Sequence, residues 1–401
     1  MTLDLANPVE IAAGAGKKPA AKLHVLTLTP FYPSLGDEVS GCFVAETLRE
    51  LESLGVKSSV IAVDSVYHPR REANQKFPAA WMRYPQIPGN LGLSTAGRFL
   101  SASVVNRIRQ IHSQTRIDLI HAHAALPCGA AAAHLSRRLG IPFVVTIHGL
   151  DVFNRCFADG IAAGWRRRAS TDVYQAARRV ICISGRIRRL LLEGMGDAAH
   201  AEVVYNGTDA DFFSPGEAER SRPLVLVVGN LLAGKGQELV FRALAALKNS
   251  LPELRCELIG EGADRERFTR LAAELGISGQ IHFLGRRSRA EVAQAMRECA
   301  VFALPSRFEG LGCVYLEAMA CGKPVIACRG QGIDEIVVHG KNGWLVPVDG
   351  LNELIDGLRT LLSDRGLRTQ IGQSARQTIL EGLTMNHQAR ALQATYQEAA
   401  R

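Results

Sequence analysis

Two carboxylates, Glu309 and Glu317, lie in the stretch FEGLGCVYLEAMACGKPV at 308–325, with seven residues between them. Glycines surround the first acid, and the second lies in an apolar run that reads as a helix ending at Gly322. A glycine-rich turn leading into a helix leaves backbone N–H groups free to bind phosphate. The pattern suggests a diphosphate at the helix end, sugar hydroxyls on Glu309 and ribose hydroxyls on Glu317. The alternative is a structural helix with a capping acid and an exposed second glutamate.

A lysine in a second glycine-rich loop could neutralise such a phosphate. Lys235 lies in GNLLAGKG at 229–236, directly after an apolar run. The loop is similar to a P-loop, but Gly236 stands where that motif needs the Ser or Thr that binds Mg²⁺, which argues against an NTPase. GEGADR at 260–265 falls short of the dinucleotide-binding fingerprint and is a weak signal.

Metal ligands are the third chemistry to weigh. By residue type alone, His121, His123 and His134 could bind a metal, and DAD at 209–211 is similar to a metal-binding DxD motif. No carboxylate partner accompanies the histidines, and DAD lies between the two halves of the chain. The nine cysteines contain no CxxC pair, which argues against a zinc site and indicates a reducing compartment. We therefore predict no metal and no cofactor.

These loops need buried parallel strands to position them. Apolar runs without alternation are typical of such strands, and here they alternate with helix-length segments, which predicts doubly wound α/β sheets. The expected strands are 23–28, 58–63, 118–123, 143–148, 180–184, 224–229, 256–260, 281–285, 301–305 and 324–328. A polar break at 205–223 separates two expected domains, 22–205 and 206–384, after a loose tail at 1–21. Because ligands bind beyond the carboxyl ends of such strands, the domains should face a central cleft.

The excess of basic over acidic side chains lies in the first half of the chain. The formal net charge is +8, and residues 22–205 hold 22 basic and 14 acidic side chains, whereas 206–401 hold 23 of each. Segments 165–170 and 178–194 concentrate the arginines. They form either a solvated face or a surface for an anionic membrane or phosphorylated partner. Few aromatic residues interleave with them, which argues against nucleic acid.

No run of about 18 apolar residues predicts a membrane span. The first twenty residues lack the basic start and long apolar centre of a secretory signal. We therefore expect a cytoplasmic protein, either in solution or peripheral on the inner face of the membrane.

The spacing E-x7-E followed by A-x-A-x-G-x-P-V resembles the retaining glycosyltransferases of family 4, which have the GT-B fold. Further blocks resemble that family in the same order, over nearly the whole chain after residue 21. They are SGCFV (40–44), TIHGLDVF (146–153), YNGTDADFF (205–213), VVGNLLAGKGQELV (227–240) and GQGIDEIVVHGKNGWLVPVDG (330–350). Several blocks in order are more specific than any one of them.

The resemblance implies roles for residues of the C-terminal domain. Lys235 would hold the donor diphosphate, Glu309 would contact the sugar hydroxyls, and Glu317 would bind ribose. The turn at Gly285 and Arg286 would lie near the base. Backbone amides of the glycine loop would contact sugar and phosphate; these belong to Gly310, Leu311, Gly312 and Cys313.

In the N-terminal domain, the resemblance implies that Ser40 and Gly41 face the phosphates and that His148 points toward the transferred sugar. The last helix, within 385–401, would cross back to the first domain. The family usually has an arginine where this chain has Asn230. Either one cation suffices, or another arginine supplies the second charge, or the chain binds donors without turning them over.

The function that follows is a retaining, metal-independent glycosyltransferase. It would move a sugar from a nucleotide-diphosphate sugar to a hydroxyl of a carbohydrate or lipid-linked acceptor, in polysaccharide or glycolipid assembly. Lys235 and the helix dipole would stabilise the leaving group. A sugar-nucleotide 2-epimerase of the same fold and a non-catalytic sugar-nucleotide-binding regulator are the alternatives, the latter motivated by Asn230.

Overall fold

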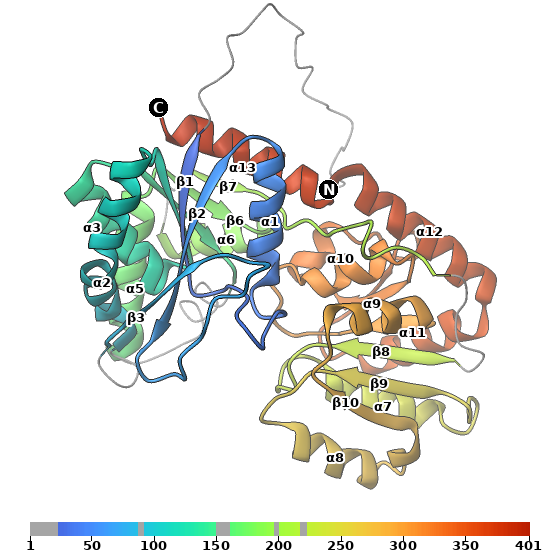
Figure 1. Ribbon diagram of the computed structural model, residues 1–401. Coiled ribbons are helices and arrows are strands. Elements are labelled where there is room, and N and C mark those ends of the chain that lie inside the picture. Colours follow the sequence, from blue (N-terminus) through green and yellow to red (C-terminus); the bar gives the residue numbers. More distant parts are fainter. Residues whose placement is uncertain (1–22, 87–91, 150–160, 196–199, 217–222) are drawn as a thin grey trace, which may run out of the picture.

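The computed structural model describes residues 23–86, 92–149, 161–195, 200–216 and 223–401, which form two parallel sheets (Figure 1). The first has the strand order β3-β2-β1-β4-β5-β6-β7 and the second β10-β9-β8-β11-β12-β13. The strands of the first sheet are β1 (His24–Thr29), β2 (Lys57–Ser65), β3 (Ala80–Tyr84), β4 (Leu119–His123), β5 (Phe143–Ile147), β6 (Arg179–Cys182) and β7 (Ala201–Val203). Those of the second are β8 (Leu224–Val228), β9 (Arg255–Ile259), β10 (Ile281–Gly285), β11 (Val301–Ala303), β12 (Val325–Cys328) and β13 (Trp344–Val346).

Helices connect and cover these strands. They are α1 (Cys42–Ser53), α2 (Gly92–Gln114), α3 (Ala130–Leu139), α5 (Ile161–Ala176), α6 (Gly185–Met195), α7 (Gln237–Leu247), α8 (Arg265–Glu274), α9 (Arg289–Glu298), α10 (Cys313–Ala320), α11 (Leu351–Ser363), α12 (Arg365–Gly382) and α13 (Met385–Ala399). Short helical turns are η1 (Ala125–Gly129), η2 (Ser278–Gln280) and η3 (Gly332–Glu335). Among the described residues, no helix combines the length and the apolar character that crossing a membrane requires.

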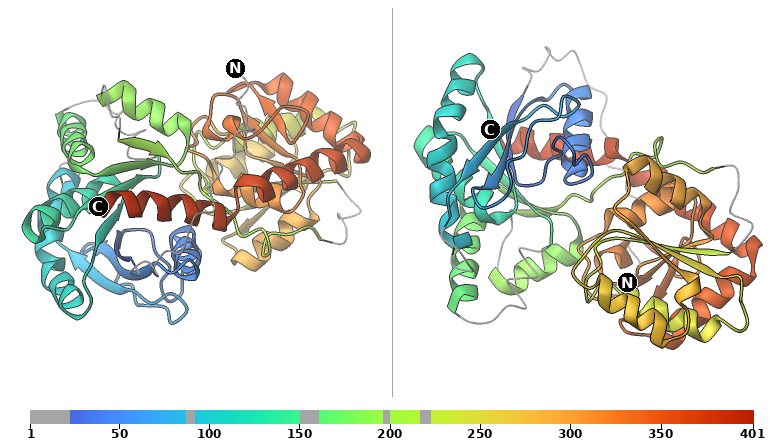
Figure 2. Two further views of the ribbon diagram at one scale, coloured as in Figure 1. Left: turned by 90° about the horizontal axis from the view of Figure 1, so that it is seen from above. Right: turned by 60° about the horizontal axis from the view of Figure 1, so that its bottom comes forward.

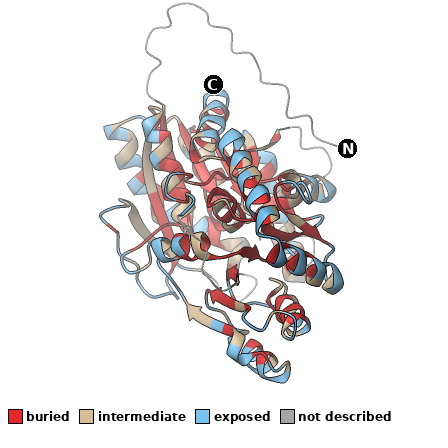
Figure 3. Ribbon diagram, turned by 90° about the vertical axis from the view of Figure 1, so that its right-hand side faces the viewer, coloured by how far each residue is buried: buried red, intermediate tan, exposed pale blue. Residues whose placement is uncertain are grey.

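The expected α/β architecture with parallel sheets is confirmed, and all ten expected strands form within two residues of the expected bounds. Figure 3 shows that the strands are largely buried. Three further strands, β3, β7 and β13, were not predicted, and each lies at the edge of its sheet. An edge strand pairs on one side and is partly exposed, so it lacks the continuous apolar run by which the other strands were found. The expected tail at 1–21 and residues 150–153 of the TIHGLDVF block lie outside the described residues.

The strand order reverses once in each sheet. β1 lies between β2 and β4, and β8 lies between β9 and β11. At such a point the connections leave in opposite directions and open a crevice at the carboxyl ends of the strands. The loop after β8 carries Lys235, and the loop after β11 carries Glu309. Both candidate residues therefore lie at the switch point of the second sheet.

The last helix, α13, packs on the N-terminal sheet although it follows the second domain in sequence (Figure 2). Its Tyr396 is fully buried, and the Tyr396 hydroxyl oxygen lies 2.7 Å from Nδ1 of His121. Gln388 of the same helix accepts a hydrogen bond from Thr47 of α1. Buried aromatic and polar contacts thus attach the end of the chain to the first domain.

Candidate active site

The glycine loop and helix expected at 308–322 are present. Gly312 has a left-handed φ of 80° as the N-cap of α10, and a Cβ atom there would lie 2.5 Å from the Tyr315 ring. Only glycine therefore allows the chain to turn into the helix at this point. Glu309 lies in the loop before the helix, and Glu317 is the fifth residue of α10.

Lys235 and Glu309 are in direct contact. The lysine Nζ lies 2.8 Å from Oε2 of the glutamate, and the two side chains are 30% and 14% exposed. The two loops are also joined through the backbone, because Arg307 donates its N–H to the Gly234 carbonyl at 2.8 Å. The pair places one cation and one carboxylate together at the carboxyl edge of β8 and β11. A lysine there can bind a phosphate, and a carboxylate beside it can accept sugar hydroxyls.

Glu317 is half-buried next to a second charged pair, which no sequence pattern predicted. Arg289, at the start of α9, forms a close ion pair with Glu46 of α1 in the other domain. Burial raises the pKa of the Glu317 carboxyl to about 7, while the charge of Arg289 lowers that pKa and the charge of Glu46 raises it further. No local pattern marks Arg289 or Glu46, because their meeting depends on how the two domains pack.

Ser40 and Arg286, assigned to opposite sides of the cleft, meet. Arg286 donates from Nη2 to Ser40 Oγ at 2.9 Å, and its Nη1 lies 3.4 Å from an oxygen of Asp37. Gly41 follows with a left-handed φ of 76°, and a Cβ atom there would lie 2.3 Å from the backbone of Phe31. Gly285 precedes the arginine with a φ of 70°. The contact joins the turn after β10 to the loop before α1.

His148 follows β5 and is held by three rings. The rings of Phe31 and Phe43 approach it edge-on at 5.4 and 5.1 Å between centroids. Its Nε2 lies 2.9 Å from Nδ1 of His123. Burial lowers the pKa of His148 to about 4, so the imidazole is neutral near pH 7. A Cβ atom at Gly310 would lie 3.4 Å from the His148 carbonyl oxygen, which brings the glycine loop and this histidine together.

Glu335, at the end of η3, links the second domain to the first. Its carboxylate accepts hydrogen bonds from the backbone N–H groups of Gly185 and Arg186, and from the Tyr205 hydroxyl at 3.0 Å. The two N–H groups belong to the first turn of α6, where a negative charge is favourable. Ser184, just before that helix, donates to the Gly310 carbonyl at 2.6 Å. This set of contacts, the α6 clasp, fixes the glycine loop against the N-terminal domain.

The remaining predicted residues lie in the same loops. Asn230 is exposed on its side chain, and its carbonyl accepts from Gln237 at 2.9 Å. Leu311 is buried and Cys313 is the first residue of α10. The structure thus brings the predicted residues of both domains to one region, while their roles toward a donor stay predictions.

The other candidate ligands have structural partners. His121 is hydrogen-bonded to Tyr396 and Thr146, and His134 to Arg137. Asp209 accepts a hydrogen bond from the N–H of Phe212 at 2.9 Å. In the described part of the chain, no group of three or more His, Cys, Asp or Glu side chains is arranged to hold a metal.

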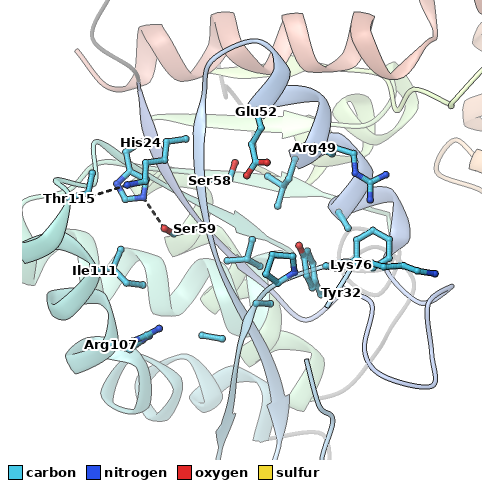
Figure 4. A pocket seen from close by; sticks show the side chains of 18 of the residues that line it. His24, Tyr32, Arg49, Glu52, Ser58, Ser59, Lys76, Arg107, Ile111 and Thr115 are labelled. Carbon is cyan, nitrogen blue, oxygen red and sulfur yellow. Dashed lines mark hydrogen bonds between the residues drawn. The ribbon is translucent and has the colours of Figure 1, made fainter. Parts of the chain in front are cut away.

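A separate groove lies beside β2, away from these loops (Figure 4). Its volume is about 520 Å³, and none of the predicted site residues lines it. His24, in its wall, is 2% exposed and lies 2.9 Å from both Ser59 Oγ and the Arg116 carbonyl oxygen. The groove is therefore not part of the candidate active site.

Two doubly wound domains, joined across the carboxyl ends of their strands by paired acids and cations, define a two-domain transferase of the GT-B class. Residues 41–212 match Glycosyltransferase Family 4, and residues 209–378 match Glycosyl transferases group 1. The chain belongs to glycosyltransferase family 4, and the resemblance found from the sequence is confirmed.

Relatives with defined names support this membership. The D-inositol 3-phosphate glycosyltransferase of Kribbella flavida is 30% identical over 372 residues, which cover 86% of this chain and 87% of that protein. A GDP-mannose-dependent alpha-(1-6)-phosphatidylinositol monomannoside mannosyltransferase of Mycolicibacterium smegmatis is 29% identical, covering 79% and 85%. The structure of sucrose-phosphate synthase from Thermosynechococcus elongatus superposes with a TM-score of 0.78 at 21% identity, over 94% of this chain and 98% of that one. This last likeness confirms the fold.

Proposed function

We propose that this glycosyltransferase binds the diphosphate of its donor between Lys235 and the N-terminus of α10. The contact between Lys235 and Glu309 carries the proposal, because it puts a cation and a hydroxyl acceptor within 2.8 Å at the switch point of the sheet. A diphosphate that takes the lysine releases the Glu309 carboxylate for the sugar hydroxyls. Glu317, further along α10, accepts from ribose, and His148 faces the sugar from the other domain.

Transfer proceeds with retention and without a metal in this proposal. Lys235 and the backbone N–H groups at the start of α10 stabilise the negative charge on the departing diphosphate. As the family resemblance implies, attack and departure take place on one face of the sugar: the acceptor oxygen bonds to the anomeric carbon, the bond from that carbon to the diphosphate breaks, and the departing phosphate takes the acceptor proton. Asn230 leaves Lys235 as the main cation in its loop.

The acceptor is a hydroxyl of a carbohydrate or a lipid-linked molecule. The names of two relatives contain an inositol phosphate or a phosphatidylinositol, and the N-terminal domain of this chain carries the positive excess. A groove of about 920 Å³ between α2, α3 and α5 is lined by Arg98, Arg137, Arg168 and the exposed Trp165. Cations and an exposed tryptophan are typical of a surface that meets anionic lipid headgroups.

Among the arginines of segments 165–170 and 178–194, Arg168 lines this groove. Arg188 donates to the Ala201 carbonyl and Arg186 donates to the Gly330 carbonyl, so these two contribute to internal contacts. Arg168 and Arg189 are exposed, on α5 and α6. We place the enzyme in the cytoplasm, at the inner face of a membrane.

Product analysis tests the function. The protein is incubated with a panel of UDP-, GDP- and ADP-sugars, with and without inositol phosphate and phosphatidylinositol vesicles. A glycosylated acceptor with retained anomeric configuration supports the proposal. An epimerised nucleotide sugar would indicate the 2-epimerase, and binding by thermal shift without any product would indicate the regulator.

A further inference from the structure

Three imidazoles lie together at the carboxyl ends of β4 and β5: those of His121 and His123 are buried, and that of His148 is half-buried. His121 and His123 end β4, and His148 follows β5, the strand that pairs with it. The ring centroids of His121 and His123 are 4.3 Å apart. Burial lowers the pKa of His148 to about 4 and that of His121 to about 3, and it holds the pKa of His123 well below its ordinary value. All three rings are therefore neutral near pH 7.

The contact between His123 and His148 is a well-aligned hydrogen bond. Nδ1 of His123 lies 2.9 Å from Nε2 of His148, the ring planes differ by 11°, and the centroids are 5.1 Å apart. Face-to-face rings would bring the centroids closer, so these rings lie edge to edge and nearly coplanar. A hydrogen bond between two neutral imidazoles contains one proton. One ring donates, the other accepts, and the tautomers of the two rings are coupled.

His123 and His121 differ in the hydrogen-bond partners of their ring nitrogens. His121 has a partner at each nitrogen, the Tyr396 hydroxyl and the Thr146 hydroxyl, both at 2.7 Å. His123 is 7% exposed, and within the described chain its Nε2 is buried without a hydrogen-bond partner. The ring lines a cavity of about 20 Å³, enough for one water molecule. Among the described residues, the hydrogen-bond partner of the His123 ring is His148, at Nδ1.

We propose that His123 is a positioning residue that keeps His148 in one tautomer and one ring orientation for the donor sugar. Within the described residues, Nδ1 of His148 makes no hydrogen bond, so it is the nitrogen that can meet a substrate hydroxyl. The tautomer decides whether that nitrogen donates or accepts, and the hydrogen bond between His123 and His148 couples this tautomer to that of His123. The His123 ring also contacts the His121 ring, and His121 is hydrogen-bonded to Tyr396 of α13. These contacts connect the tautomer of the pair to the packing of α13 on the first domain. The inference rests on the proposed role of His148.

The test compares three substitutions. His123→Leu removes the hydrogen bond with little change in volume, and His123→Asn keeps a polar group near the position of Nδ1. The control is His24→Leu, since His24 is equally buried in the same sheet, has partners at both nitrogens and lies at the far end of β1 (Figure 4). Protein labelled with ¹⁵N-histidine reports each tautomer through its long-range nitrogen–proton couplings.

In the wild type we expect one tautomer at His148. His123→Leu should give a mixture and lower kcat about 100-fold, as expected for a misplaced catalytic group, with the KM for the donor nearly unchanged. His123→Asn should recover most of kcat, and His24→Leu should match the wild type in both readouts. An unchanged His148 spectrum in His123→Leu overturns the inference, and so does a changed spectrum with normal turnover. A wild type that turns over no nucleotide sugar refutes the proposed function instead, because the spectra do not depend on a substrate.

Discussion

Lys235 Nζ lies 2.8 Å from Glu309 Oε2, so the two side chains proposed to bind phosphate and sugar form an ion pair with each other. Because both are partly exposed, solvent and salt weaken this attraction, and a diphosphate with two negative charges can compete for the lysine. Donor binding would then free the carboxylate at the moment the sugar arrives. The pair would then couple the proposed binding of the phosphate to the proposed binding of the sugar.

Lys235→Ala should remove nearly all turnover while the fold is retained, because the side chain lies in a loop rather than in a core. Lys248→Ala is a matched control: its ammonium bonds the Leu275 carbonyl outside the predicted site. Steady-state kinetics and circular dichroism measure the two effects. A Lys235→Ala enzyme that binds and reacts like wild type would place the donor site elsewhere.

Asn230→Arg should tighten nucleoside diphosphate binding by about 1.5–3 kcal/mol, or roughly ten- to a hundredfold, because a second charged contact is added. The exposed Asn230 side chain leaves room for the larger group. Turnover need not rise, since tighter ground-state binding does not help the chemical step. Calorimetry with UDP and GDP gives the affinities. Equal affinity in both proteins would mean that this position does not reach the diphosphate.

Glu317→Gln and Glu309→Gln should separate binding from turnover. Loss of the ribose acceptor in Glu317→Gln should weaken nucleotide binding by about 1.5–3 kcal/mol. Glu309→Gln should mainly reduce kcat, and free nucleoside diphosphate should bind at least as well, because Lys235 loses its internal partner. Calorimetry and kinetics on both variants give the comparison. Unchanged nucleotide affinity in Glu317→Gln would end the ribose assignment.

Nucleotide affinity should rise with pH through the range set by Glu317. Its pKa is raised by burial to about 7, and the ionised carboxylate is the stronger acceptor of ribose hydroxyls. Affinity should therefore increase from about pH 6 to about pH 8. The phosphate of the nucleotide also titrates, and Glu317→Gln measures that contribution alone. The increase in the wild type should be larger than the increase in the variant. A wild type that follows the Gln variant across this range would contradict the assignment.

The same shift affects stability with the opposite sign. The folded-state pKa lies above the ordinary value of 4.5, so between pH 4.5 and about 7 the folded protein binds more protons than the unfolded chain. The contribution of Glu317 to the free energy of unfolding thus falls as pH rises, and Glu317→Gln should flatten that part of the profile.

Glu335→Ala should open the α6 clasp. Three donors, the N–H groups of Gly185 and Arg186 and the Tyr205 hydroxyl, lose one charged acceptor, and each such hydrogen bond is worth about 1.5–3 kcal/mol. We expect higher donor KM, lower kcat and a larger radius of gyration by small-angle scattering. Glu353→Ala, an exposed acid on α11, is the control. Unchanged scattering and kinetics in Glu335→Ala would show that other contacts hold the domains together.

Vesicles that contain anionic lipid should bind the protein more strongly than neutral vesicles, and added salt should weaken the binding. Arg168→Glu and Arg137→Glu, in the groove between α2, α3 and α5, should reduce it by roughly 1 kcal/mol or more each. Arg390→Glu, on α13 and outside that groove, should not. Equal binding to both vesicle types at low salt would favour a soluble acceptor and a merely solvated basic face.

The sequence by itself determined the parallel sheets, the helix that carries Glu317 and the position of Lys235 in a glycine loop. Buried parallel strands need continuous apolar runs, and a loop with left-handed residues needs glycine, so both leave marks within a few consecutive residues. Edge strands such as β3 leave weaker marks because half of their surface is exposed. Family 4 membership followed from several such local blocks in order.

Only the tertiary structure decided which of these residues meet. Arg289 with Glu46, Glu335 with the first turn of α6, and Tyr396 with His121 join residues more than 100 positions apart. Neither partner in such a pair needs a recognisable neighbour in sequence, since the attraction acts through space after the domains have packed. The raised pKa of Glu317 and the neutral state of His148 arise in the same way, because burial depends on every surrounding element rather than on a local pattern.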